Sequence, residues 1–439
     1  MSRNGDFGPS ACLLIFSIVL AMAPGAWAQS NYKTLHRFSF PDGVAPYGSV
    51  VFDHAGNLYS TTWYGGDSDR GTVFRLTPSA SGRWKKETIY SFKGGSDGAF
   101  PFAGLIFDKA GHLYGTAREG GGTQDAGVVF ELSPNAGGTW SERILYSFCA
   151  QKNCRDGSTP DARLTFDPAG NLYGTTYYGG HLIQCCGVVF KLKPNADGSW
   201  KESVLHSFCA LMYCPDGANP YAGVTLDAAG NLYGTAANGG AHGGRDYTYK
   251  YGVVFKLTPN QDGSWTESVL HSFCSLANCR DGWQPDGGVI IDSAGDLYGT
   301  TWEGGDFSCD VANIGCGVVY KLTRTTNGSW KEKVVHTFEK KDGAHPIAGL
   351  IFDRAGILYG TTSGGGNFLS RCGAFGCGTV FKLAPNSKSG WSETVLHDFF
   401  NAPGFCPFGD LAFDTAGLLY GTTLGDEATS LGSVFQVTP

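Results

Sequence analysis

The chain has 439 residues, a net charge of −7 and a hydrophobic content of 42%, which is sufficient for a folded core. Its acidic balance and its lack of a Lys/Arg cluster argue against binding to nucleic acid or to anionic membrane surfaces. Its 66 glycines recur at fixed places in the sequence, which predicts many turns rather than low complexity.

Residues 1–28 are predicted to be a secretory signal peptide. Arg3 supplies a positive charge, residues 11–23 are apolar but too short to span a bilayer comfortably, and Ala26-Trp27-Ala28 forms a small-residue cleavage site. No second apolar run of membrane length follows, and the sequence ends at Pro439 without an apolar tail. We therefore expect a mature chain without a membrane span, located in the periplasm or outside the cell.

Residues 29–439 contain seven copies of one order of motifs. A segment such as "AGLIFD" is followed by "LYGTT", a Gly-rich loop of variable length, "GVVFKLTP", a "NADGSW" turn and "ESVLHSF". The segments are short, rich in Val, Ile, Phe and Tyr, and bounded by Gly, Asn, Asp or Pro, which is typical of strands. The pattern predicts an all-β, single-domain, seven-bladed β-propeller with four antiparallel strands per blade. The blades begin near residues 48, 103, 162, 222, 287, 348 and 409.

Residues 32–38 are an extra copy of the fourth strand. Their sequence, "YKTLHRF", matches "ESVLHSF", whereas the last repeat stops after its third strand. Placing residues 32–38 on the last blade closes the ring and removes an exposed sheet edge.

The loops on the two faces of the predicted propeller differ in length. Turns between the first and second strands and between the third and fourth strands are short, whereas the other loops vary and contain all thirteen cysteines that follow residue 28. Three blade connections share "SFCxxxxC", so a disulfide across each loop is expected in an oxidising compartment, although bonds to neighbouring loops are equally allowed. The odd count leaves at least one thiol free or bonded to another molecule. The disulfide candidates are Cys149, Cys154, Cys209, Cys214, Cys274, Cys279, Cys309, Cys316, Cys372 and Cys377.

Two acidic positions recur in the repeat. The first ends each "AGLIFD" segment, and we interpret it as a carboxylate that accepts backbone N–H groups within its own turn rather than as an ion ligand. The second belongs to "DGxxP" and is expected on the variable face near the axis, where Asp-Gly turn geometry is one explanation and a structural cation such as calcium is the alternative. The first set is Asp53, Asp108, Asp167, Asp227, Asp292, Asp353 and Asp414, and the second is Asp42, Asp97, Asp156, Asp216, Asp281 and Asp342.

Aromatic residues that are not shared by all repeats are the candidate ligand contacts. Such side chains on the loops of an exported protein stack on sugars or anchor a protein partner, although they also cover neighbouring loops. The candidates are Trp63, Tyr64, Tyr177, Tyr178, Trp283 and Trp302.

No catalytic motif stands out in the sequence, but a site assembled across blades would leave no linear motif. The alternative to a binding protein is therefore a propeller enzyme, namely a polysaccharide lyase, a lactonase or a glycan hydrolase. Its active residues would be polar groups that occur once near the axis, and the candidates are Glu119, Glu303, His181 and Arg245.

The combination "DGxxPxAGLIFDxAGxLYGTTxxGG…GTVFKLxP" resembles the GloVer tandem repeats of bacterial exported "choice-of-anchor" proteins, over essentially the whole mature chain. The resemblance implies a β-propeller-like fold and export, and it supplies no catalytic residues. The family pattern includes varied C-terminal anchors, so the absence of one here favours release. We expect a secreted monomer that binds a glycan, an envelope component or a cell-surface protein, without a cofactor.

Overall fold

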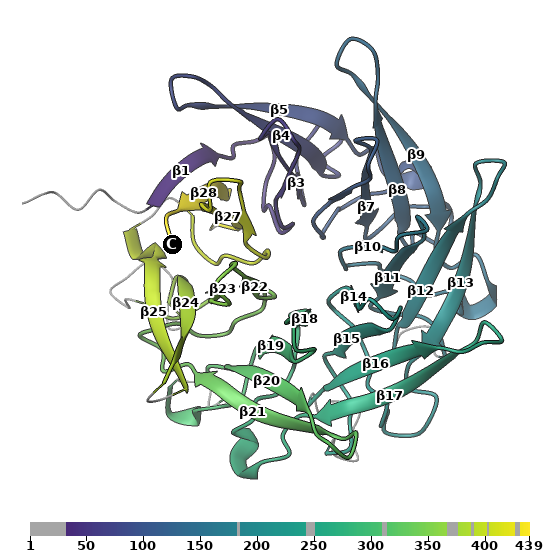
Figure 1. The fold of residues 1–439 in the computed structure, drawn as a ribbon. Coiled ribbons are helices and arrows are strands. Elements are labelled where there is room, and N and C mark those ends of the chain that lie inside the picture. Colours follow the sequence, from purple (N-terminus) through teal and green to yellow (C-terminus); the bar gives the residue numbers. More distant parts are fainter. Residues whose placement is uncertain are drawn as a thin grey trace, which may run out of the picture.

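The computed structural model describes residues 32–181, 185–242, 251–309, 314–366, 376–387, 390–401, 404–425 and 431–439. Seven four-stranded antiparallel sheets are arranged as blades around a central axis, which confirms the predicted seven-bladed β-propeller (Figure 1). The predicted signal peptide, residues 1–28, lies outside the described residues.

Each blade runs from a two-residue strand at the axis to a long strand at the periphery. The innermost strands are β2 (Val51–Phe52), β6 (Ile106–Phe107), β10 (Thr165–Phe166), β14 (Thr225–Leu226), β18 (Ile290–Ile291), β22 (Ile351–Phe352) and β26 (Ala412–Phe413). The second strands are β3 (Leu58–Thr62), β7 (Leu113–Ala117), β11 (Leu172–Thr176), β15 (Leu232–Ala236), β19 (Leu297–Thr301), β23 (Leu358–Thr362) and β27 (Leu419–Thr423).

The third and outer strands are longer and form the body of each blade. The third strands are β4 (Thr72–Pro78), β8 (Val128–Pro134), β12 (Val188–Pro194), β16 (Val253–Pro259), β20 (Val318–Arg324), β24 (Thr379–Asn386) and β28 (Ser433–Val437). The outer strands are β5 (Trp84–Ser91), β9 (Trp140–Ser147), β13 (Trp200–Ser207), β17 (Trp265–Ser272), β21 (Trp330–Thr337), β25 (Gly390–Asp398) and β1 (Tyr32–Arg37).

The helical segments among the described residues are single 3₁₀ turns in the loops. They are η1 (Gly95–Asp97), η2 (Lys152–Cys154), η3 (Ala277–Cys279), η4 (Phe307–Cys309) and η6 (Phe399–Asn401). In this part of the chain no helix has the length and apolar character needed to cross a membrane.

Strand β1 pairs antiparallel with β28, so the first described strand completes the last blade. Figure 1 shows the two strands side by side, as the extra copy of the fourth strand predicts. The closure is reinforced nearer the axis, where the Thr422 hydroxyl donates to the Gly48 carbonyl at 3.2 Å. Equivalent hydroxyl-to-carbonyl bonds join neighbouring blades at five further boundaries, so the ring closes with the same chemistry that links its other blades.

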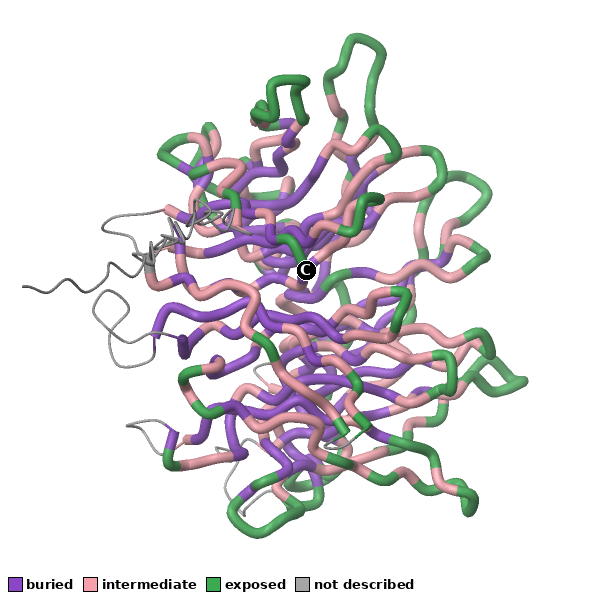
Figure 2. Tube along the Cα trace, turned by 60° about the vertical axis from the view of Figure 1, so that its left-hand side comes forward, coloured by how far each residue is buried: buried purple, intermediate pink, exposed green. Residues whose placement is uncertain are grey.

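The hydrophobic core lies between the blades rather than within any one of them. The Phe of each "SF" segment meets the third-strand aromatic residue of the next blade edge to face, as in the Phe208–Phe255 pair, whose ring centroids are 5.1 Å apart. The pair Phe38–Phe74, also at 5.1 Å, repeats this contact where the ring closes. Figure 2 shows the buried residues inside the sheets and the exposed ones at the loop tips.

Candidate functional site

The seven innermost strands surround a cavity of about 450 Å³ on the propeller axis. Every blade contributes to its wall the residue that follows the proline of "DGxxP", or of the corresponding Pro407 segment in the last blade. The blade sequences are otherwise similar, so the varied side chains at this position give the cavity its distinct chemical character. We call the set the axial ring, and its members are Tyr47, Phe102, Asp161, Tyr221, Asp286, Ile347 and Phe408.

A left-handed residue directs each chain segment toward the axis. The residue before each of these prolines has φ between 53° and 60°, although none of the seven is a glycine. This conformation costs roughly 1 kcal/mol for an ordinary residue, so its seven-fold recurrence requires compensating bonds. At Thr159 the N–H donates to Ala126 O of the preceding blade at 2.8 Å, and the carbonyl accepts from Tyr177 N at 2.9 Å. These bonds fix the direction in which Asp161, two residues further on, enters the cavity wall.

One side of the axial ring is aromatic. Tyr47 stacks against Phe102 with ring centroids 4.7 Å apart, and it meets Phe408 edge to face at 4.9 Å. Trp63 packs behind them, 5.5 Å from Tyr47 and 5.4 Å from Phe102. The three ring members come from the last blade and the first two, so they form a continuous apolar wall.

The other side of the axial ring is acidic, and it touches the aromatic side where Tyr221 meets Phe102 edge to face at 5.5 Å. Asp161, Tyr221 and Asp286 come from three consecutive blades, and both carboxylates are buried, with 4% and 7% exposure. Burial raises the pKa of Tyr221, and the nearby carboxylates of Asp161 and Asp286 raise it further. Burial likewise raises the pKa of Tyr177, behind the ring, to about 12, with contributions from Tyr178 and the same two carboxylates. Two acids and two neutral phenols therefore share one small region.

Asp161 is the least satisfied of these groups. Arg118 Nη1 lies 3.1 Å from Asp161 Oδ2 as an ion pair, yet neither carboxylate oxygen has a hydrogen-bond partner among the described residues. Burial raises the pKa of Asp161 to about 7 even though Arg118 acts to lower it. The Arg118 guanidinium is shared, because its carbon also lies 5.6 Å from the centre of the Trp63 ring. A buried carboxylate in this state gains free energy from any ligand that donates a hydrogen bond to it.

Deeper in the cavity the lining is small, with two charged exceptions. Gly104, Gly223, Gly288 and Gly349 occupy one position of the lining, at which the third blade has Arg163 and the last has Asp410. A Cβ on Gly223 would lie 2.2 Å from Arg163 O, so glycine is needed where these two inner segments approach. Asp410 Oδ1 accepts a hydrogen bond from Gly349 N at 2.7 Å, whereas the Arg163 side chain is exposed to the cavity.

The predicted aromatic contacts do not form a single group. Trp63 and Tyr177 touch the axial ring, the latter through Tyr221 at 5.9 Å. Tyr64, with 42% exposure, and Tyr178 pack one step further out, against Trp63 at 6.1 Å and Tyr177 at 4.7 Å, respectively. The remaining two candidates pack elsewhere, Trp283 against Tyr251 at 5.4 Å and Trp302 against His345 at 5.7 Å.

Sequence reasoning missed the two carboxylates of the axial ring, Asp161 and Asp286, and the cavity residues Arg163 and Asp410. The signal that could have found them is an alignment column without a consensus. Directly after seven equivalent prolines the repeats carry Tyr, Phe, Asp, Tyr, Asp, Ile and Phe. A position that varies this much inside a regular repeat is free of the mechanical role that fixes its neighbours.

The "DGxxP" acids do not lie near the axis as expected. Each contacts the His or Tyr of the preceding outer strand, as in His206 Nε2–Asp216 Oδ2 at 3.2 Å and Tyr146 Oη–Asp156 Oδ2 at 2.8 Å. The left-handed residue that follows the turn separates this peripheral acid from the axial position, which the sequence alone did not reveal. The other pairs are Asp42 with His36, Asp97 with Tyr90, Asp281 with His271 and Asp342 with His336.

A glutamate of the next blade faces five of these acids across the blade boundary. Burial raises the pKa of Glu202 to about 7, and the neighbouring Asp156 raises it further. Oε1 of Glu202 is buried without a hydrogen-bond partner, and the same holds for its four counterparts. We call this set the boundary glutamates, and its members are Glu142, Glu202, Glu267, Glu332 and Glu393, all with a pKa raised to about 7. At the boundary between the last blade and the first, Lys86 stands in this place and pairs with Asp42.

The candidate residues for an enzyme do not converge on the cavity. Glu119 is half-buried, Glu303 is buried and His181 is exposed, and none of these three described residues lines the axial cavity. Burial raises the pKa of Glu119, with a further contribution from Asp125. Arg245 lies outside the described residues.

The structure joins eight of the ten candidate cysteines in four disulfides. Cys149–Cys154, Cys209–Cys214 and Cys274–Cys279 close the "SFCxxxxC" loops, as expected, and Cys309–Cys316 links the ends of another loop. Cys377 is disulfide-bonded, and the candidate Cys372 lies outside the described residues. Adjacent Cys185 and Cys186 are also joined, and Cys406 is the free thiol among the described cysteines.

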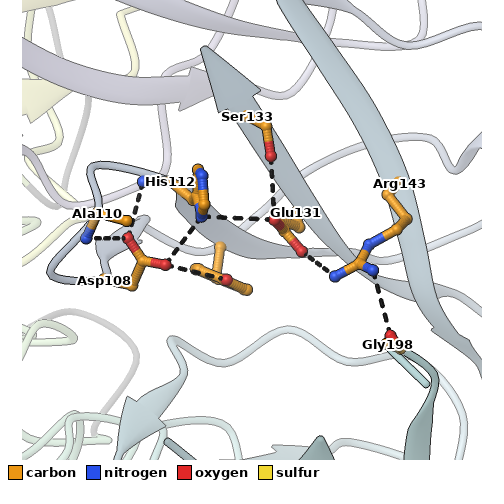
Figure 3. Close-up of polar contacts among 8 residues, drawn as sticks. Asp108, Ala110, His112, Glu131, Ser133, Arg143 and Gly198 are labelled. Atoms are coloured by element: carbon orange, nitrogen blue, oxygen red, sulfur yellow. Dashed lines mark hydrogen bonds and ion pairs between the residues drawn. The ribbon is translucent and has the colours of Figure 1, made fainter. Parts of the chain in front are cut away.

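A second polar cluster lies on the short-turn face of the second blade (Figure 3). His112 Nδ1 lies 2.9 Å from Asp108 Oδ2 and 3.6 Å from Glu131 Oε1. Glu131 also pairs with Arg143, which donates through Nη1 to Gly198 O of the third blade at 3.2 Å. Each charged group in this cluster has a partner within the protein, so the cluster joins two blades and leaves no carboxylate free for a ligand.

The sequence profile of the Gloeobacter/Verrucomicrobia repeat matches residues 15–247 and 242–439. The chain belongs to this family. The match covers both halves of the propeller and confirms the resemblance carried by the repeated motifs. No curated protein sequence matches the chain.

Similarity to solved structures concerns the fold alone. The chain is similar to PorZ, described as an essential bacterial surface component of the type-IX secretion system of Porphyromonas gingivalis, with 15% identity and a TM-score of 0.51. The alignment covers 91% of this chain and 47% of PorZ, so the chain spans about half the length of that protein. A luciferin-regenerating enzyme aligns over 93% of this chain and 95% of its own, with 12% identity and a TM-score of 0.40.

Proposed function

We propose that this propeller is a binding protein that holds a saccharide unit of a glycan in its axial cavity. The observation that carries the proposal is the division of the axial ring into the aromatic wall of Phe408, Tyr47 and Phe102 and the acidic wall of Asp161 and Asp286. A sugar ring has apolar C–H faces and an equatorial edge of hydroxyl donors. The two walls match those two surfaces, and the cavity volume of about 450 Å³ lies within the usual range for small-ligand sites.

Asp161 supports a ligand that donates hydrogen bonds. Its buried carboxylate has an ion-pair partner in Arg118 but no hydrogen-bond donor among the described residues. A sugar hydroxyl would supply that donor, and the exposed Arg163 side chain could donate to the ring or glycosidic oxygens in return. Trp63 and Tyr177 act in this proposal as supports for the two walls rather than as an exposed platform.

We place this activity in the periplasm or outside the cell, on an exported protein. The disulfides of the loop face are typical of oxidising compartments. PorZ, which shares the fold at low identity, is described as a bacterial surface component, and this is consistent with an envelope glycan or a cell-surface partner.

A binding screen tests the proposal. Purified chain 29–439 is expected to bind a subset of bacterial envelope or plant-type polysaccharides in a glycan array, followed by calorimetry with the corresponding oligosaccharides. Asp161→Asn and Tyr47→Ala should each weaken binding by about tenfold or more, because one removes a charged acceptor and the other a stacking surface. Trp283→Ala is the matched control, since Trp283 packs against Tyr251 away from the cavity.

Two outcomes would overturn the proposal. One is the absence of any glycan ligand for a chain that melts cooperatively and carries its disulfides. The other is binding that Trp283→Ala or Trp302→Ala abolishes while Asp161→Asn leaves it unchanged, because the ligand would then lie on the outer loops.

A second function, cleavage of the bound glycan, is favoured by one observation. The pKa of Asp161 is raised to about 7 by burial, so its carboxyl group holds a proton near neutral pH, as a general acid must. Asp286 would be the second carboxylate in the same cavity. Incubating the ligand from the binding screen with wild-type protein and with Asp161→Asn, and measuring new reducing ends, decides between cleavage and binding alone.

A further inference from the structure

Four cysteine sulfurs meet at the boundary between the third and fourth blades. Cys185 and Cys186 come from the loop between β11 and β12, whereas Cys209 and Cys214 come from the connection between β13 and β14. The Sγ atoms of Cys185, Cys186 and Cys209 all lie within 4.8 Å of one another, and Cys214 is bonded to Cys209. Two disulfides from separate segments of the chain are therefore in direct contact.

The surroundings distinguish the roles of these cysteines. Cys186 and Cys209 are buried, with 0% and 5% exposure, whereas Cys185 is partly exposed. Cys186 is also held against the next blade, because its carbonyl accepts a hydrogen bond from Asn219 N at 2.8 Å. An external thiol thus reaches Cys185 first, and the buried Cys186 is then the freed sulfur that lies within 4.8 Å of Cys209 Sγ.

Two other loops of the same chain lack this third sulfur. Cys149–Cys154 and Cys274–Cys279 close equivalent connections, but the position of Cys186 is taken by Ala126 and Tyr251 in the loops that precede them. Among the described residues, Cys185, Cys186 and Cys209 are the three cysteines whose sulfurs all lie within 4.8 Å of one another. The protein therefore contains its own controls for a property that requires two neighbouring disulfides.

We propose that these four cysteines form a thiol–disulfide exchange site that accepts two electrons from a dithiol. A thiolate of the dithiol attacks Cys185 Sγ, the Cys185–Cys186 bond breaks, and Cys186 leaves as a thiolate. The second thiol of the dithiol then displaces Cys185, which takes up a proton, and the dithiol departs as a disulfide.

Cys186 completes the transfer within the protein. Its thiolate attacks Cys209 Sγ, the Cys209–Cys214 bond breaks, and Cys214 leaves as a thiolate that is protonated. The products are one Cys186–Cys209 disulfide and the thiols of Cys185 and Cys214, so the two hydrogens of the dithiol are accounted for. The exchange moves a covalent link from inside one loop to the boundary between two blades.

Limited reduction of the wild-type chain tests the exchange directly. The chain is treated with one equivalent of dithiothreitol, quenched with N-ethylmaleimide and mapped by mass spectrometry of peptides under non-reducing conditions. We expect a peptide pair joined through Cys186 and Cys209, with labelled Cys185 and Cys214. Labelled Cys149 with Cys154, or Cys274 with Cys279, should appear as free pairs without cross-links to other peptides.

A double variant removes any dependence on the reductant. Cys185→Ser/Cys214→Ser leaves Cys186 and Cys209 as the two remaining thiols of the cluster, and air oxidation should join them in more than half of the molecules. Cys154→Ser is the matched control, in which Cys149 should stay fully labelled because Ala126 offers no sulfur. Full labelling of Cys186 and Cys209 in a double variant that melts like the wild type would overturn the proposal. So would limited reduction that opens Cys185–Cys186 without forming the Cys186–Cys209 link.

Discussion

Asp161 and Asp167 stand on either side of the same two-residue strand, β10, and their environments are opposite. Asp167 accepts hydrogen bonds from Ala169 N and Asn171 N, both at 2.9 Å, and also from the Asn171 side chain and the Tyr173 hydroxyl. Partial burial acts to raise the pKa of Asp167, but these bonds outweigh it and the pKa lies below its ordinary value. Asp161 has no such donors, and its pKa is raised to about 7.

This difference distinguishes a residue that every blade needs for its turn from a residue that varies between blades. All seven blades keep the acid at the position of Asp167, together with the tyrosine that donates to it, because that turn cannot form as well without it. The position of Asp161 carries no turn, and its carboxylate has no hydrogen-bond donor among the described residues. Within this blade, the carboxylate with hydrogen-bond donors, Asp167, shapes a turn, whereas the buried carboxylate without donors, Asp161, is the candidate ligand contact.

The largest expected effect concerns the boundary glutamates. They recur in five blades, yet one buried carboxylate oxygen of each has no hydrogen-bond partner among the described residues. Their pKa values are raised from the ordinary 4.5 to about 7, so the folded chain binds more protons than the unfolded chain between those values. Stability should therefore fall as the pH rises from 5 to 8. A variant with Glu→Gln at all five positions should lose most of this fall, so its melting temperature should exceed that of the wild type by several degrees at pH 8.

Melting curves at pH 5 provide the reference for that comparison, since the glutamates of the folded wild type are protonated there and the two proteins should differ least. An equal difference in melting temperature at pH 5 and pH 8 would show that these glutamates are ionised in the folded chain at both values. In that case the repeat would tolerate unsatisfied charge, and the contrast between Asp161 and Asp167 would lose its meaning.

The second expected effect concerns Asp167, whose carboxylate accepts hydrogen bonds within its own turn. Asp167→Ala removes the acceptor for four donors, and we expect it to lower the free energy of unfolding by about 2 kcal/mol, measured by denaturant titration at pH 7. Asp197→Ala is the control, because Asp197 lies in an exposed turn and accepts only from Ser199. A change of similar size in both variants would mean that the Asp167 turn is not specially held.

The smallest effect has the opposite sign. Asp161→Asn should raise the free energy of unfolding by about 1 kcal/mol at pH 8 and by less at pH 5. The reason is that the pKa of Asp161 is about 7 in the folded chain and has its ordinary value of 3.8 in the unfolded chain, so the wild type loses stability as the pH rises between these values, whereas the amide of the variant does not titrate. Destabilisation at pH 8 would instead show that the Arg118–Asp161 ion pair contributes more than burial of the charge costs.

The fold could be predicted from sequence because seven copies of each strand average out local ambiguity. The seven copies of "LYGTT" and "GVVFKL" and the unmatched strand 32–38 were sufficient to set the blade number and the closure. The roles of Asp53 and its six counterparts followed from turn chemistry in the same way. The structural role of a repeated residue can be inferred from the sequence alone, since each copy tests the inference made for the others.

The axial site could not be predicted from the sequence because its residues do not repeat from blade to blade. An acid stands at the position of Asp161 in only two of the seven blades, and its role depends on six side chains from other blades that lie tens to hundreds of residues away in the sequence. The expectation that Asp156 lies near the axis was wrong because Thr159, with φ of 60°, turns the chain between the two acids. Cys185 and Cys186 were recognised as loop cysteines, but their contact with Cys209 arises only when two loops meet.

Closure through β1 also sets the order of events when the ring forms. Strand β1 precedes every other strand of the propeller in the sequence and its partner β28 follows them all, so the register Tyr32↔Val437 joins the two ends of the propeller. Until then β1 is an unpaired edge strand, and the blades between the two strands can assemble on their local contacts. We therefore expect ring completion to be the slow, non-local step of folding, and the interval before it to be when β1 is most exposed to pairing with other chains.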